Sequence, residues 1–139
     1  MGILDRLFRK KREEKAVKES YKYKEPTDLE RICSDSPKLF EALKETMFLD
    51  PTKIEVSFED AISRAKELEK SKDKLRAAVW YRIAGGLAIY EGNVSKVKEC
   101  FTRYAKLTGV NLKILEVADE AVKKAHEYYK KYLKDKKGS

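Results

Sequence analysis

The stretch that spans residues 77–90 constrains the fold of this chain more than any other part of its sequence. It reads AAVWYRIAGGLAIY, and Arg82 is its only charged residue. A helix that is apolar on nearly every face has to be buried on nearly every face. With 14 residues and an arginine among them, the stretch is too short to span a bilayer. The sequence therefore predicts the central helix of a folded domain, with Gly85 and Gly86 where another helix approaches the backbone closely.

Helix start and stop signals organise the chain beyond Pro26. Ser, Thr, Asp or Asn before an apolar periodic segment predicts a helix start, and Gly after such a segment predicts its end. Starts fall at Thr27 with Glu30, Ser36 with Pro37, Ser57 with Asp60, Asn93 and Asn111, and ends at Asp50-Pro51, Gly92 and Gly109. The alternation of Ile54, Val56 and Phe58 is too short for a lone strand to persist. The sequence predicts an all-α fold of about five to six helices in antiparallel hairpins.

The region around the central helix resembles a tetratricopeptide-type helical hairpin, in which small and large residues let two antiparallel helices pack closely. The matching residues are Tyr81, Ala84, Gly85, Ala88, the turn Gly92-Asn93, and then Val97, Phe101 and Tyr104. A partial earlier copy at Ala61, Ala65 and Leu68 begins 36 residues ahead of Val97. The resemblance implies that the long helix from Asn111 is a C-terminal capping helix. A plain helical bundle stays open as the alternative, because it also places small residues at these spacings.

The resemblance also implies a partner-binding face on the first helix of the hairpin. This face consists of Val79, Arg82, Gly86, Ile89 and Tyr90. Family members that bind a peptide carboxylate use lysine and asparagine there, and Gly86 cannot replace the asparagine amide. We therefore expect an apolar and aromatic groove that accepts a helix of a protein partner.

The N-terminal segment of residues 2–12, GILDRLFRKKR, has an amphipathic pattern. Its apolar arc consists of Ile3, Leu4, Leu7 and Phe8, and its basic residues are Arg6, Arg9, Lys10, Lys11 and Arg12. It resembles the short membrane-targeting helices at the start of peripheral cytoplasmic proteins. That resemblance implies contact with an anionic membrane surface. The polar residues 13–26 that follow are expected to form a linker.

The net charge of +8 is unevenly distributed along the chain. Residues 1–26 carry +4 and residues 123–139 carry +5, whereas residues 27–122 carry −1. A groove that neutralises nucleic-acid phosphates needs basic residues on one face of the domain itself. Basic ends suit an anionic membrane, nucleic acid or simple solubility. We expect a basic tail and linker over residues 1–26, one all-α domain over residues 27–135 and a disordered end over residues 136–139.

The chain lacks the residue patterns of common enzyme and metal sites. Its only histidine, His126, has no second histidine at the zinc-protease spacing, and no glycine-rich phosphate-binding motif precedes a helix. One histidine and two separated cysteines, Cys33 and Cys100, do not fill a tetrahedral zinc site. We expect no catalytic residue, metal or cofactor. The cysteines are expected to be buried thiols in a reducing cytoplasm, with a disulfide between them left open.

Three functional classes follow from these observations. We prefer a non-catalytic helical adaptor or scaffold that binds a protein partner in the cytoplasm, with residues 2–12 as a tether to the inner membrane face. The alternative is a nucleic-acid-associated protein that uses its basic N- and C-terminal ends. The third class is a subunit that acts only within an oligomer, such as a homo-oligomer.

We predict weak, reversible membrane binding by residues 2–12. Each apolar side chain contributes at most about 1.5–3 kcal/mol and each basic residue about 1 kcal/mol, while backbone ordering costs about 1–2 kcal/mol per residue. Binding should therefore require anionic lipid and fade in high salt. Co-sedimentation with anionic and neutral vesicles measures it, and a Leu7→Glu, Phe8→Glu variant should bind more weakly than the full chain. Equal binding by both proteins would show that charge alone acts.

Overall fold

The computed structural model of the chain describes residues 27–133. This part contains α2 (Asp28–Ile32), α3 (Pro37–Thr46), the 3₁₀ helix η1 (Pro51–Lys53), α4 (Phe58–Lys70), α5 (Lys74–Glu91), α6 (Val94–Thr108) and α7 (Ile114–Tyr132). The predicted all-α class is confirmed, with six α-helices and no strand in residues 27–133. The amphipathic segment of residues 2–12 and the predicted tail of residues 136–139 lie outside the described residues.

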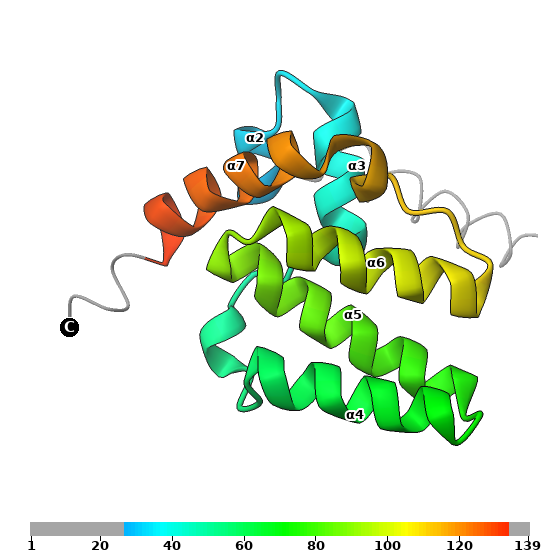
Figure 1. Cartoon of the computed structure of the whole chain (residues 1–139). Helices are drawn as coiled ribbons and strands as arrows, with labels where there is room; N and C mark the ends of the chain where they lie inside the picture. Colours follow the sequence, from blue (N-terminus) through cyan, green and yellow to red (C-terminus); the bar gives the residue numbers. More distant parts are fainter. Residues whose placement is uncertain (1–26, 134–139) are drawn as a thin grey trace, which may run out of the picture.

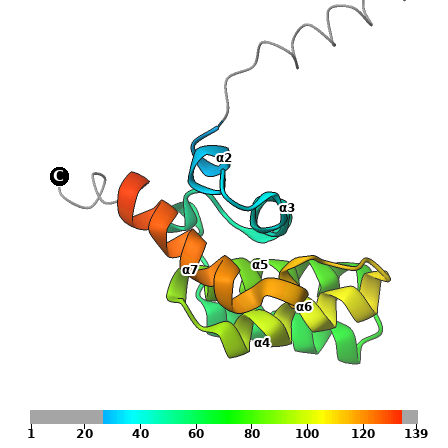
Figure 2. The ribbon, with the colours of Figure 1, turned by 90° about the horizontal axis from the view of Figure 1, so that it is seen from above.

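Helices α4, α5 and α6 lie side by side as one layer, with α5 in the middle (Figure 1). The turns at residues 71–73 and 92–93 join them as antiparallel neighbours. Helix α7 packs against both this layer and the pair formed by α2 and α3, so that it connects the two parts (Figure 2). In the described part of the chain, no helix is both long and apolar enough to cross a membrane.

The predicted caps define most of the helix ends, but α3 ends at Thr46 rather than at the predicted Asp50-Pro51, which begins η1. Thr27 and Glu30 form a reciprocal capping box at α2, and the side chains of Ser36, Ser57 and Asn93 accept backbone N–H groups at the starts of α3, α4 and α6. Gly92 and Gly109 end α5 and α6 with φ angles of 78° and 75°. A residue without a Cβ adopts this left-handed conformation readily. Helix α5 is longer than the apolar stretch alone predicts, because Asp73 caps it three residues earlier, at Lys74.

The predicted start of the last helix at Asn111 is wrong. Helix α7 begins at Ile114, and its N-cap residue Lys113 makes no side-chain capping bond. The backbone N–H of Lys113 donates instead to the carboxylate of Glu45 on α3, at 3.4 Å. A distant side chain thus replaces the local cap that Asn111 indicated. Helix α7 is also kinked at Val117, where φ is −134° and ψ is 29°.

The paired glycines of α5 lie where the sequence predicts close approach. A Cβ added at Gly85 would stand 2.5 Å from the Phe101 ring of α6, and one added at Gly86 would meet the Phe48 ring. Phe101 itself is fully buried. Both aromatic rings therefore occupy the space that a side chain on α5 would need.

We predict that Gly85→Leu destabilises the fold by about 1–3 kcal/mol or more, because the new side chain would overlap the buried Phe101 ring. Urea unfolding followed by helical circular dichroism measures the free energy of unfolding. The control, Ser63→Leu on the exposed face of α4, should change it by no more than about 0.5 kcal/mol. An unchanged free energy in Gly85→Leu would contradict the close packing of α5 on α6.

Candidate functional site

The structure separates the five residues of the predicted partner-binding face. Val79 and Arg82 are exposed, with Val79 at 51% of its full exposure. Ile89 is fully buried, Gly86 is buried under the Phe48 ring, and Tyr90 is half-buried. The part of the predicted groove at Gly86 and Ile89 is therefore covered by the chain itself, and these two residues cannot contact a partner.

The segment after α3 and helix α7 cover the C-terminal half of α5. The hydroxyl of Tyr129 donates a hydrogen bond of 2.6 Å to the backbone carbonyl of Phe48 and so fixes this segment in place. The rings of Tyr90 and Tyr129 meet edge to face, with 5.2 Å between their centroids. At the end of α5, Nε2 of His126 donates to the carbonyl of Ile89 at 3.2 Å. These contacts join residues 37 to 81 positions apart, which explains why helical spacing on α5 alone did not predict them.

The N-terminal half of α5 has no such cover. Val79, Trp80, Arg82 and Ile83 form a surface that we call the open α5 face. Val79 and Ile83 are four positions apart and so share one side of the helix. Trp80 and Ile83 are half-buried, whereas Val79 and Arg82 are exposed. This face is the accessible remainder of the predicted groove.

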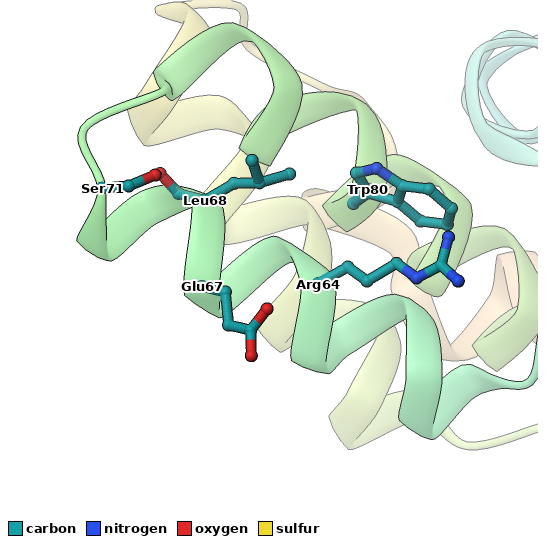
Figure 3. A pocket seen from close by; sticks show the side chains of 5 residues that line it. All are labelled: Arg64, Glu67, Leu68, Ser71 and Trp80. Carbon is teal, nitrogen blue, oxygen red and sulfur yellow. The ribbon is translucent and has the colours of Figure 1, made fainter.

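A shallow groove between α4 and α5 adjoins this face. It is lined by Arg64, Glu67, Leu68, Ser71 and Trp80 and has a volume of about 440 Å³. We call it the α4–α5 groove. Figure 3 shows Arg64 reaching toward Trp80 while Glu67 turns away from it, and the Arg64 guanidinium carbon lies 4.7 Å from the centroid of the indole ring. This cation–π contact presents an arginine and a tryptophan together at the surface.

Arg82 borders a second and smaller pocket on the side of α6. This pocket has a volume of about 230 Å³ and is lined by Glu45, Arg82, Phe101, Tyr104, Val110 and Leu112. The Arg82 guanidinium donates to the backbone carbonyl of Glu45 at 3.3 Å. Among the described residues, neither Arg82 nor Arg64 forms an ion pair with a carboxylate. Both cations therefore remain available to an acidic group of another molecule.

Four buried thiol and phenol groups have raised pKa values. None of these four groups lines either of the two pockets described above. Burial raises the pKa of Cys100 to about 12 and also raises those of Cys33 and Tyr129. Burial, followed by the Glu69 carboxylate that accepts its hydroxyl at 2.6 Å, raises the pKa of Tyr81 to about 12. Each shift favours the neutral form, whereas an activated nucleophile needs the anion. Cys33 and Cys100 are buried free thiols, as predicted.

In residues 27–133, no cluster of three or more His, Cys, Asp or Glu residues is placed to hold a metal ion. The accessible groups are one valine, one tryptophan and two arginines around shallow pockets. Sequence reasoning missed Arg64, Leu68 and Trp80 as surface residues. The signal that could have identified them is the arginine at position 64, one turn before Leu68 on the helix that precedes the apolar stretch.

Comparison with protein-family models, with curated proteins and with solved structures finds no match for this chain.

We predict that the fold loses stability as the pH rises from about 10 to 12, and that Tyr81 causes part of this loss. Below pH 10 both states keep the phenol proton, whereas between pH 10 and 12 the unfolded chain releases it first, so rising pH favours unfolding. Tyr81→Phe should therefore reduce the decline by up to about 1.4 kcal/mol per pH unit. Urea unfolding at several pH values measures the slope, with Tyr104→Phe as the control. An unchanged slope in Tyr81→Phe would contradict the assignment.

Proposed function

We propose that this chain is a non-catalytic helical adaptor that binds a protein partner on the open α5 face. One observation carries the proposal. Val79 stays 51% exposed on a helix whose other half is covered by the chain's own side chains. An apolar surface that continues into a groove is typical of a protein-binding site. The groove beside Trp80 offers room for an apolar anchor of the partner.

The residue types on this surface favour a helical partner segment with acidic flanks. Tryptophan and arginine are enriched among the residues that dominate binding energy at protein interfaces. The guanidinium groups of Arg64 and Arg82 lie on opposite sides of Val79 and Ile83 along the surface, since one borders the α4–α5 groove and the other the pocket near α6. Carboxylates on both edges of an apolar stripe would pair with them.

The tetratricopeptide-type hairpin is part of this proposal for α5 and α6. Support comes from the turn at Gly92 and Asn93 and from the packing of Gly85 against Phe101, a small residue against a large one. The partner face of such a hairpin is the exposed side of its first helix, which is α5 here. The membrane tether at residues 2–12 stays a prediction, because it lies outside the described residues.

We predict that Val79→Glu weakens partner binding without unfolding the chain. The exposed position tolerates glutamate in the free protein, whereas a complex would bury that charge against apolar side chains. The full chain is immobilised, native lysate is passed over it, and each purified captured protein is titrated against the variants. Affinity should fall at least about tenfold in Val79→Glu, since one buried valine contributes about 1.5–3 kcal/mol.

Leu49→Glu supplies the matched control, because Leu49 is 54% exposed and lies in the segment after α3. It should retain wild-type affinity. Capture that is equal for Val79→Glu and the wild type would refute the open α5 face as the binding site. A variant that lacks residues 1–26 distinguishes partners of the helical domain, which it should still bind, from partners of the N-terminal tail, which it should not.

A further inference from the structure

The turn between α4 and α5 carries a concentrated positive charge. Residues 70–76 contain Lys70, Lys72, Lys74 and Arg76 and only one carboxylate, that of Asp73. This carboxylate caps α5 at the N–H of Arg76 and pairs with the Arg76 guanidinium at 3.6 Å. The surrounding region of residues 27–122 is almost neutral as a whole. The cluster is therefore a local feature that the overall charge of the domain conceals.

Leu75 lies within this cluster and is 78% exposed, more than the other exposed large apolar residues of the described chain. We call Lys70, Lys72, Lys74, Leu75 and Arg76 the basic tip. Lys72 has a φ of 65°, in the left-handed region that turns the chain sharply between the two helices. The turn forms one end of the three-helix layer (Figure 1). Leu75 does not line the α4–α5 groove.

We propose that the basic tip contacts an anionic lipid surface. An exposed leucine with basic residues near it in the sequence matches the boundary between headgroups and acyl chains, because the apolar side chain enters it while the ammonium groups stay among the phosphates. Lysines near an anionic leaflet are attracted to it by its surface potential. Nucleic acid accounts for the lysines but gives no role to an exposed leucine.

This contact lies one helical turn before the open α5 face, since Leu75 is four residues ahead of Val79 on α5, and it is distinct from the predicted tether at residues 2–12. A single weak membrane contact gives marginal, reversible attachment, and stable attachment requires a second. The basic tip supplies a contact that belongs to the folded domain itself. It also gives the domain a defined orientation, with the α4–α5 turn toward the lipid.

Vesicle co-sedimentation of the full chain tests the proposal. All proteins carry Leu7→Glu and Phe8→Glu, so that the apolar arc of residues 2–12 does not contribute. This background protein should bind vesicles of 70% phosphatidylcholine and 30% phosphatidylserine, but not pure phosphatidylcholine. Adding Leu75→Glu should lower the partition coefficient at least about tenfold. Adding Lys72→Ala and Lys74→Ala should lower it about 25-fold, or fivefold for each lysine removed.

Two controls match these changes in charge and polarity. Lys123→Ala with Lys130→Ala removes two exposed lysines of α7, and Leu49→Glu adds a carboxylate at another exposed leucine. Both should retain binding within about twofold, apart from the small effect of net charge. Circular dichroism verifies that every variant stays folded, which the exposure of all these side chains favours.

Three outcomes would overturn the proposal. The first is no binding of the background protein to the anionic vesicles at low salt. The second is equal loss of binding in the lysine control and in the lysine variant of the tip, which would show a diffuse effect of charge. The third is loss of binding with the tip lysines but none with Leu75→Glu. In that case a polybasic surface acts without insertion, and the same variants assayed with a DNA oligonucleotide would show whether nucleic acid is its ligand.

Discussion

The contact between Gly85 and Phe101 fixes the arrangement of the central layer. Because Gly85 has no side chain, the Phe101 ring of α6 lies directly on the backbone of α5, where a Cβ would be only 2.5 Å away. Two mid-helix glycines reduce helix propensity by about 1 kcal/mol each relative to alanine. The burial of an entire phenylalanine ring offsets this loss, since such a side chain contributes about 1.5–3 kcal/mol. The position and orientation of α6 on α5 depend on this contact.

A second contact between a glycine and an aromatic ring, at Gly86, divides α5 into a covered and an open half. Gly86 accepts the Phe48 ring, and Tyr129 of α7 holds that segment through its hydrogen bond to the Phe48 carbonyl. Beyond it, the bond from Arg82 to the carbonyl of Glu45 joins α3 to the N-terminal half of α5, while Val79 stays exposed. The open α5 face is therefore a consequence of how far the segment after α3 extends, and the proposed binding site begins where that segment stops.

Local signals in the sequence predicted the helices well, because the N-caps at which the helices begin are local. Thr27, Ser36, Ser57 and Asn93 each bond to a backbone group three residues away, so spacing alone identifies them. The start of α7 and the cover over Gly86 depend on Glu45, Phe48 and Tyr129, which are distant in the chain from what they contact. No periodicity encodes such contacts. Two of the five residues of the predicted partner face, Gly86 and Ile89, are consequently ones that the fold buries.

The two proposed surfaces adjoin each other on α5. Lys74 and Trp80 are six residues apart on α5, which corresponds to about 9 Å along the helix axis. That distance is about one Debye length at physiological ionic strength. An acidic partner segment beside Trp80 and an anionic leaflet at the basic tip therefore repel each other only weakly. Since the α4–α5 groove includes Ser71 of the turn itself, a partner bound there would be held next to the lipid surface. The geometry thus favours a domain that presents its partner at the membrane over one in which lipid and partner compete.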